Sequence, residues 1–260
     1  MNQIKIHLNN LCVCFACKYE LGDKDSFDSL DFRLNEGEIL CLVKKGLSGS
    51  STINNSQMGG IPLPKFGEQF WFAGESCPDK ETPISSLIPS WSMSFLPWKN
   101  VVENMVFGFN GSEYKEKYLL AMEWLENVGL SGCALRLPAQ ISQTQRLRIA
   151  LARVYMEKPK LIVADNPLYG LSHLDWKVML EEFLRIWHQN PVPMVYMTSN
   201  IDEAIFLSDR IFLISEKTCI DNNPIDNPIA RCDRNWIKII ETEEYEQIYD
   251  SLTSLNDNNL

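Results

Sequence analysis

The sequence predicts an α/β fold that is built on a mostly parallel sheet. Short, continuous apolar runs such as residues 38–43 and 161–164 are typical of strands that are buried on both faces. Between the later runs, apolar residues recur at helical spacing. This alternation favours a parallel sheet with helices packed on it. A helical stretch over about residues 98–153 interrupts the strands, which predicts a helical subdomain inserted into the sheet core.

Three segments in the first third of the chain are predicted to be strands. Ile4, Ile6 and Leu8 alternate with polar residues, which is the pattern of a half-buried strand. The run 38–43 predicts a strand that is buried on both faces. Residues 69–72 form a third apolar run between glycines and predict a further short strand.

The middle of the chain predicts two helices. In residues 112–130, apolar side chains fall at helical spacing, and Gly129 lies near the expected end. Asn110 supplies a start signal for this helix. Residues 142–156 are rich in Arg, Leu and Ala and predict the second helix.

Strands and helices alternate again in the later part of the chain. We expect strands at 161–164, 194–197 and 211–214, with helices at 173–188 and 201–208 between them. Prolines precede the 194–197 strand, at a position where a missing hydrogen-bond donor is tolerated.

Composition excludes two broad classes of protein. The 260 residues carry a formal charge of −10, which argues against a general nucleic-acid binder. No apolar run approaches the roughly 20 residues that a membrane-spanning helix needs. No secretory signal is expected, because residues 1–10 have no apolar core. Residues 239–260 carry six acids and no Lys or Arg, so the negative charge is concentrated in an acidic C-terminal tail.

The eight cysteines predict reduced thiols in a cytosol rather than a disulfide framework. Cys12, Cys14 and Cys17 are closely spaced and could suggest a metal cluster. No clear fourth ligand follows them at a suitable spacing, so reduced or buried thiols are the favoured interpretation.

Two predicted strand ends carry residues with possible chemistry, because ligands bind outside the carboxyl ends of parallel strands. After Val43 the chain reads Lys44-Lys-Gly-Leu-Ser-Gly-Ser-Ser-Thr52, a partial match to the phosphate-loop pattern Gly-x-x-x-x-Gly-Lys-Ser/Thr. Asp165 ends the 161–164 strand, where phosphate-loop enzymes hold Mg²⁺. Each feature alone also fits a structural role without chemistry: the loop could be a glycine-serine turn, and Asp165 could be a helix cap.

Taken together, these motifs resemble the ATP-binding subunits of ABC transporters over nearly the whole chain. The resemblance is strongest to importers of nitrate, sulfonates, taurine or bicarbonate. It rests on segments that keep the order and spacing of the family: residues 37–43, 67–72, 95–98, 138–142, 148–153, 159–165, 202–210 and 228–234.

The resemblance implies a P-loop NTPase-like sheet with antiparallel N-terminal strands and an inserted helical subdomain. The implied organisation is an N-terminal part of the nucleotide-binding core at 1–97 and a helical (signature) subdomain at 98–157. The C-terminal part of the core follows at 158–216, and the acidic tail occupies 217–260.

ATP and Mg²⁺ are the cofactors that the resemblance implies. Phe15 falls at the position of the adenine-stacking aromatic, and Ser142 at the serine of the signature that clamps the partner subunit's ATP. Ser51 and Asp165 fall at the magnesium positions. The phosphate-binding positions are Ser48, Gly49, Ser50, Ser51 and Thr52.

The catalytic positions of the family hold other residues here. Ser50 occupies the place of the loop lysine, and Trp91 that of the glutamine that helps to hold magnesium and water. Asn166 stands where a glutamate polarises the attacking water, and Ser199 replaces the switch histidine. The signature segment 141–145 keeps its serine and loses both glycines. An amide accepts no proton at neutral pH, and loss of a general base costs about 10²–10⁴ in rate.

These departures predict a pseudo-ATPase that has lost hydrolysis, with ATP binding also weakened. Such a chain would act as a structural or regulatory subunit on the permease of an importer, paired with a second, identical or homologous, ATP-binding subunit. It would lie in the cytoplasm, on the inner face of the plasma membrane.

Two alternatives stay open. The first is a functional ATPase that energises uptake of a small anion, with Lys44 or Lys45 replacing the loop lysine. The second is a regulator that pairs with intact ABC ATPases. Trp91, Phe95 and Trp98 could form a partner-binding patch or belong to the core.

Overall fold

A mostly parallel sheet of six strands lies at the centre of the computed structural model, which describes residues 3–8, 30–35, 37–44, 70–72, 85–88, 95–159, 161–214, 225–231 and 239–257. Its strands, in spatial order, are β5 (Ser85–Ile88), β6 (Leu161–Asp165), β7 (Met194–Thr198), β3 (Ile39–Lys44), β8 (Arg210–Ile214) and β9 (Ile225–Asp226). Neighbouring strands are parallel except for β8 and β9. The sheet therefore has the mostly parallel character that the strand–helix alternation predicts.

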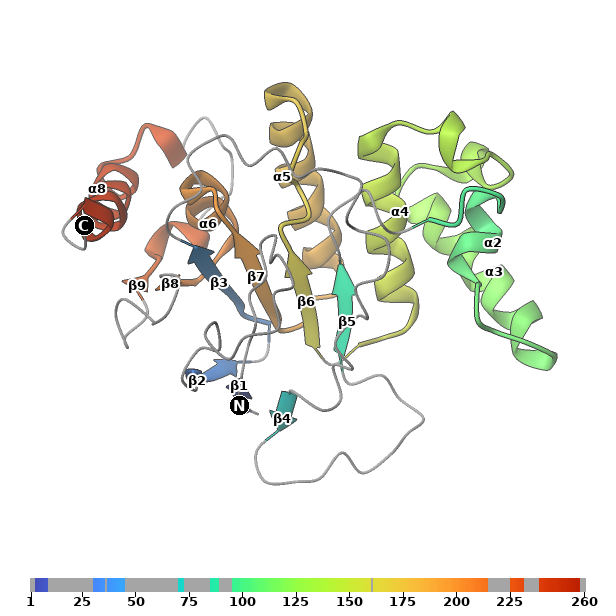
Figure 1. The fold of residues 1–260 in the computed structure, drawn as a ribbon, viewed down its shortest axis with the longest axis horizontal. Coiled ribbons are helices and arrows are strands. Elements are labelled where there is room, and N and C mark those ends of the chain that lie inside the picture. The colour runs from blue at the N-terminus through green and yellow to red at the C-terminus, as the bar shows by residue number, and fades with distance from the viewer. Residues whose placement is uncertain are drawn as a thin grey trace, which may run out of the picture.

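A smaller antiparallel sheet is formed by N-terminal segments. It contains β2 (Leu30–Asn35), β1 (Gln3–Leu8) and β4 (Phe70–Phe72), with β1 in the middle. In Figure 1 this sheet lies below the amino ends of the larger one. The antiparallel N-terminal strands implied by the sequence resemblance are confirmed by this pairing.

The helices divide into a group beside β5 and a group around β7 and β8 (Figure 1). The first group holds α2 (Val101–Met105), α3 (Ser112–Asn127) and α4 (Gln143–Met156), with short 3₁₀ turns at Ser131–Cys133 and Pro138–Gln140. The second group holds α5 (His173–Gln189), α6 (Ile201–Leu207) and α8 (Glu243–Asp257), with a 3₁₀ turn at Pro228–Arg231. None of the described helices is long and apolar enough to cross a membrane.

Most predicted elements are found within a residue or two of their expected bounds. The structure adds elements that the sequence analysis did not predict: β2, β5, β9, α2 and α8. Helix α8 shows that part of the acidic tail packs on the protein, since Ile248 and Leu252 are buried. Its acidic outer face concealed the apolar positions, which are separated by one helical turn.

The core is apolar and continuous from the sheet into the helical segment. Ile39, Cys41 and Val43 of β3 belong to the same buried cluster as Val101 of α2 and Leu125 of α3. Burial on both faces explains the continuous apolar runs at 39–43 in β3 and 194–197 in β7. The core therefore fixes the carboxyl ends of β3, β6 and β7 relative to one another.

The loop before α2 is held by one buried amide. Asn104 is 2% exposed, and its side-chain oxygen accepts a hydrogen bond from Leu96 N–H at 2.7 Å. Its amide nitrogen donates to the carbonyls of Leu96, Lys99 and Asn100 at 2.9–3.1 Å. This amide fixes residues 95–100, a segment on which the sequence resemblance rests.

We expect Asn104→Ala to lower the free energy of unfolding by about 2–4 kcal/mol, because buried backbone groups lose their partner. Chemical denaturation of the full-length variant measures this change. Asn104→Asp is the matched control, since it keeps the acceptor for Leu96 N–H and removes the amide donors. An alanine variant as stable as the wild type would contradict the role of this amide.

Candidate functional site

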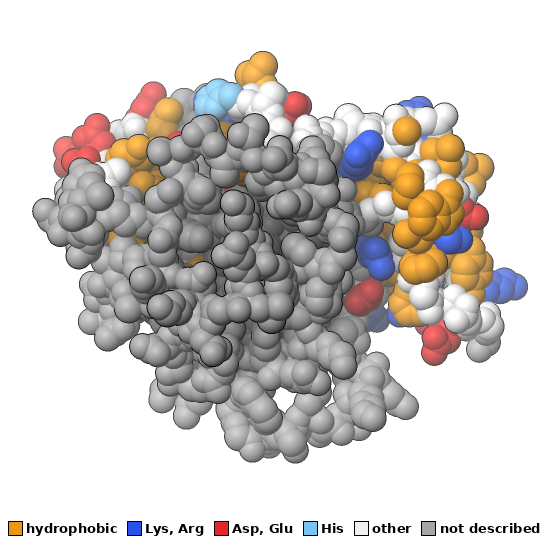
Figure 2. Space-filling view, viewed as in Figure 1, with side chains coloured by type: hydrophobic (Ala, Val, Ile, Leu, Met, Phe, Trp, Pro, Cys, Tyr) orange, Lys and Arg blue, Asp and Glu red, His pale blue; other side chains and the backbone are white. Residues whose placement is uncertain are grey.

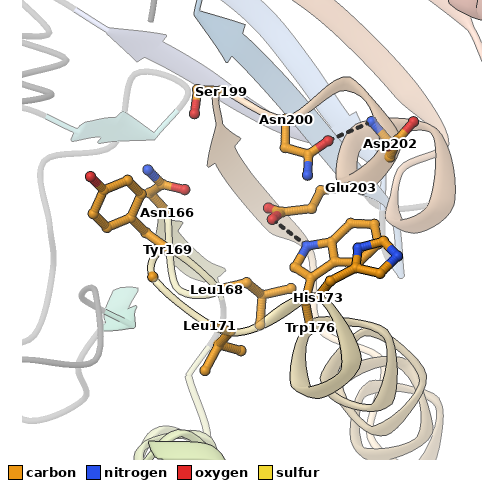
Figure 3. Close-up of a pocket in the computed structure, with 11 residues that line it drawn as sticks. Asn166, Leu168, Tyr169, Leu171, His173, Trp176, Ser199, Asn200, Asp202 and Glu203 are labelled. Carbon is orange, nitrogen blue, oxygen red and sulfur yellow. Dashed lines mark hydrogen bonds between the residues drawn. The ribbon is translucent and has the colours of Figure 1, made fainter. Parts of the chain in front are cut away.

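A pocket of about 340 Å³ opens at the carboxyl ends of β6 and β7 (Figure 3). Its walls come from the turn after β6, the start of α5, and the loop between β7 and α6. The lining residues are Asn166, Leu168, Tyr169, Gly170, Leu171, His173, Trp176, Ser199, Asn200, Asp202 and Glu203. This is the sheet edge at which ligands bind in open parallel α/β folds.

Asn166 forms the turn that follows β6. Its backbone lies in the left-handed region, with a φ of 44°, a conformation that Asn tolerates better than most residues. Its N–H donates to the carbonyl of Met197 on β7 at 2.8 Å, and its own carbonyl accepts from Tyr169 N–H at 3.1 Å. The backbone of Asn166 is thus fixed against the neighbouring strand, and its side chain lines the pocket.

Ser199 lies in the loop between β7 and α6. Side chains at both ends of this loop accept hydrogen bonds from its backbone and from the first turn of α6. Thr198 Oγ1 accepts a hydrogen bond from Asn200 N–H at 3.0 Å. Asn200 then caps α6, because its side-chain oxygen accepts from Asp202 N–H at 2.9 Å. These bonds set the position of Ser199 in the wall opposite Asn166 (Figure 3).

A buried carboxylate lies at the base of the pocket. Glu203 is 3% exposed and accepts hydrogen bonds from Trp176 Nε1 at 2.6 Å, Thr198 Oγ1 at 2.7 Å and the Tyr196 hydroxyl at 3.0 Å. Burial raises the pKa of the Glu203 carboxyl, because the loss of hydration outweighs the stabilisation of its charge by the three donors. Burial likewise raises the pKa of Tyr196, and the nearby Glu203 carboxylate adds to this increase.

The aromatic side of the pocket is formed by the first turn of α5. His173 stacks on Trp176 with ring centroids 5.7 Å apart and the ring planes inclined by 16°. Ser172 caps this helix, since its hydroxyl oxygen accepts from Asp175 N–H at 3.2 Å. The cap and the stack hold the Trp176 indole in position to donate to Glu203.

The structure brings together two of the residues predicted from the sequence to be at the site, Asn166 and Ser199. Asp165 ends β6, and its backbone pairs in register with Met197. Ser142 is not part of the pocket: it is exposed and caps α4, in a capping box with Gln145. The remaining predicted residues lie outside the described part of the chain: Phe15, Ser48, Gly49, Ser50, Ser51, Thr52 and Trp91, together with Lys45 and the cysteine group at 12, 14 and 17.

The structure also bears on the predicted aromatic patch and on the cysteines. Trp98 is 71% exposed, which excludes a core role, whereas Phe95 is half-buried and packs against the core. Cys41 and Cys133 are buried free thiols. Among the described side chains, no group of three or more His, Cys, Asp or Glu residues could hold a metal ion.

The sequence analysis assigned no role to Glu203 or to its donors. A signal for Glu203 existed, because this acid sits in a short helix whose following residues are all apolar. A charge at a buried helical position needs partners. Which partners it finds depends on β7 and α5, which lie elsewhere in the sequence.

A parallel sheet with a pocket at the ends of β6 and β7, an added antiparallel sheet and a helical segment beside β5 defines a nucleotide-binding fold of the ABC ATPase class. Among solved structures, the chain is similar to cbiO1 from Clostridium perfringens, part of the ABC transporter complex cbiONQ, with a TM-score of 0.60 and 15% identity. That match covers 99% of this chain and 98% of the other, and supports the fold.

The sequence comparisons establish the family. The family model described as "ABC transporter" matches residues 27–169, and the chain belongs to the ABC transporter family. It is 30% identical over 199 residues to an aliphatic sulfonates import ATP-binding protein of Pseudomonas savastanoi, covering 76% of this chain and 71% of the relative. A relative of the same description from Rhizobium johnstonii is 30% identical over 229 residues, covering 87% and 83% of the two chains.

The raised pKa of Glu203 gives a prediction for stability. The native state binds this proton more tightly than the unfolded state does, so above the ordinary Glu pKa of about 4.3 the native state keeps more protons than the unfolded state. The contribution of Glu203 to stability is therefore greatest below that pKa and falls as the pH rises. We expect the stability advantage of the wild type over Glu203→Gln to shrink as the pH rises above about 4.3.

Urea denaturation of both proteins at each pH measures this difference. The exposed Glu181 of α5 offers a matched control, and Glu181→Gln should show no comparable dependence on pH. An advantage over Glu203→Gln that grows with pH would mean that the ionised form of Glu203 is the one that the fold favours.

Proposed function

We propose that this chain is the ATP-binding-cassette subunit of an ABC importer and that it does not hydrolyse ATP. It serves as a structural or regulatory subunit on a permease. The observation that carries the proposal is the pocket in which Asn166 and Ser199 face each other. The sequence resemblance assigns these two residues to the positions of the family's catalytic glutamate and switch histidine. Neither side chain has the chemistry of the residue that it replaces.

Asn166, Ser199 and Glu203 supply no substitute for the missing base. An Asn amide and a Ser hydroxyl do not take up a proton at neutral pH. Glu203 supplies a carboxylate in the same pocket, but its oxygens already accept from three donors and it is 3% exposed. In Figure 3 this carboxylate points toward Trp176. Its bonds favour a structural role over proton transfer to an attacking water.

ATP and Mg²⁺ are the ligands expected of an ATP-binding subunit, and this chain would bind them at a weakened site. Ser51 and Asp165 have the oxygen ligands that Mg²⁺ prefers, and bound Mg²⁺ would neutralise charge on the phosphates. Ser50 in place of a lysine removes a positive charge from the phosphate loop. The pocket wall adds none, because its lining residues, all of them described, include Asp202 and Glu203 and no Lys or Arg.

A permease is the proposed docking partner, and the helical segment is the proposed docking surface. Figure 2 shows hydrophobic side chains gathered over this segment, with Lys and Arg among them. Trp98 and Leu135 are 71% and 75% exposed, and Phe107 and Leu137 are also exposed. Lys99 lies over the Phe107 ring, 5.7 Å from its centroid. Such a mixed apolar and basic surface is suited to a protein partner.

The relatives guide the remaining parts of the proposal. Their names describe import of aliphatic sulfonates, and we assign this chain to uptake of a small anion of the same kind. Docking on a permease would put it on the cytoplasmic, inner face of the plasma membrane, paired with a second ATP-binding subunit. Leu174, which is 79% exposed at the start of α5, offers apolar surface close to the pocket for such a pairing.

ATP turnover tests the loss of hydrolysis. We expect the purified full-length chain to turn over ATP at least about 10²-fold more slowly than an intact family member, because it lacks the general base. Asn166→Glu restores only that base, so we expect this variant to stay inactive while Ser50 occupies the lysine position. A rate comparable with that of the intact relative would refute the proposal.

Nucleotide binding with and without Mg²⁺ separates a scaffold from an ATP-responsive subunit. If Asp165 holds Mg²⁺ beside bound ATP, Asp165→Asn should weaken the magnesium-dependent affinity by about tenfold or more, since a charge-assisted contact is lost. Titration with a fluorescent ATP analogue measures this affinity. The exposed Asp250, on α8, gives the matched control Asp250→Asn, which should bind as the wild type does.

A further inference from the structure

Helix α6 links the pocket to the C-terminal part of the chain. Its first turn contributes Asp202 and Glu203 to the pocket wall. Helix α8 packs on α6, and the two lie side by side in Figure 1. Ile248 and Leu252 of this helix are buried, with exposures of 7% and 0%.

The carboxyl end of α6 is fixed by a buried side chain. Asn227, which is 2% exposed, donates from its amide nitrogen to the carbonyls of Ile205 and Ser208 at 2.7 and 2.8 Å. Its side-chain oxygen accepts from Ile229 N–H at 3.1 Å. Asn227 thereby satisfies carbonyls at the end of a helix, where they lack partners within the helix.

The amino end of α6 is held by α8. The Tyr245 hydroxyl donates to Asp202 Oδ1 at 2.5 Å, across 43 residues of sequence. Tyr245 stacks on Tyr249, with ring centroids 5.8 Å apart, and the Thr242 hydroxyl oxygen accepts from Tyr245 N–H at 3.2 Å. Burial and the hydrogen bond to Asp202 raise the pKa of Tyr245, so the phenol stays protonated and able to donate.

We propose that α8 is a built-in positioning element that holds the wall of the pocket through the Tyr245–Asp202 hydrogen bond, so that a change in the packing of α8 is transmitted to the pocket. Asn227 keeps the far end of α6 in place, and the movable contact is the one beside the pocket. Asp202 directly precedes Glu203, the residue that joins α6 to β7 and α5. A shift of the first turn of α6 would therefore reach both the pocket wall and the buried carboxylate.

The connection between α8 and the pocket wall does not depend on whether the chain hydrolyses ATP. A segment whose acidic composition alone suggested a tail would thereby have a regulatory role. A partner that displaces or tightens α8 would act on the loop at residues 199–202 without entering the pocket. The connection works in both directions, since coupling between two sites is reciprocal.

Amide hydrogen exchange of the full-length protein tests this connection directly. Tyr245→Phe removes only the hydroxyl and keeps the ring that packs on Tyr249. We expect amides in residues 199–207 to exchange roughly three- to tenfold faster in this variant, because a hydrogen bond to a charged group is lost. Amides in α8 should also exchange faster.

Tyr249→Phe is the matched control, because Tyr249 lies on the same helix and forms the other half of the stack. We expect it to leave exchange in residues 199–207 unchanged. Faster exchange in α8 alone for Tyr245→Phe would overturn the proposal, as would equal acceleration of residues 199–207 by both variants. Unchanged exchange in that segment for Tyr245→Phe would also overturn it.

The reciprocal substitution gives a second, independent measurement. Asp202→Ala should accelerate exchange in α8, which lies far from it in sequence, by a similar factor. The double variant Asp202→Ala/Tyr245→Phe should exchange in α8 no faster than the faster single variant, because both substitutions remove one shared bond. Fully additive effects in the double variant would refute a direct connection.

Discussion

Burial of one carboxylate is the constraint on which the pocket depends. A charge that leaves water needs hydrogen-bond donors, and Glu203 of α6 receives them from α5 and from two positions on β7. Satisfying this group therefore fixes three elements relative to one another at the carboxyl edge of the sheet. The same bonds orient the Trp176 indole, on which His173 stacks. The shape of the pocket follows from this internal requirement, and no bound ligand is needed to impose it.

The chain keeps the fold of an ABC ATPase, and in the proposed function two catalytic positions of the family hold Asn166 and Ser199. Asn166 and Ser199 face each other because β6 and β7 are adjacent parallel strands, whatever side chains follow them. Backbone bonds such as that from Asn166 N–H to the Met197 carbonyl do not depend on side-chain chemistry. Retention of the scaffold is thus compatible with loss of hydrolysis. A subunit of this kind could still occupy its place on a transporter, because docking depends on surface and shape rather than on a general base.

The local sequence pattern predicted most of the helices and strands but missed several of them. Strands such as β3 and β7 were predictable because burial on both faces demands continuous apolar runs. Short elements contain too few apolar residues for their periodicity to be recognised, since β5 is half serine and α2 has only five residues. Helix α8 was missed because its charged outer face dominates the composition of residues 239–260. Its few apolar positions can be recognised as a packing face only once α6 is known to lie beside them.

The sequence by itself determined the fold class and the family resemblance, and it supplied the hypothesis of altered catalytic positions, because these depend on local pattern and on residue order. Only the tertiary structure decided that Asn166 and Ser199 share a pocket with Glu203, and that Tyr245 contacts Asp202. The reason is physical: hydrogen-bond partners of buried groups come from elements far apart along the chain. Their pairing is decided by how strands and helices pack, which neither periodicity nor composition specifies.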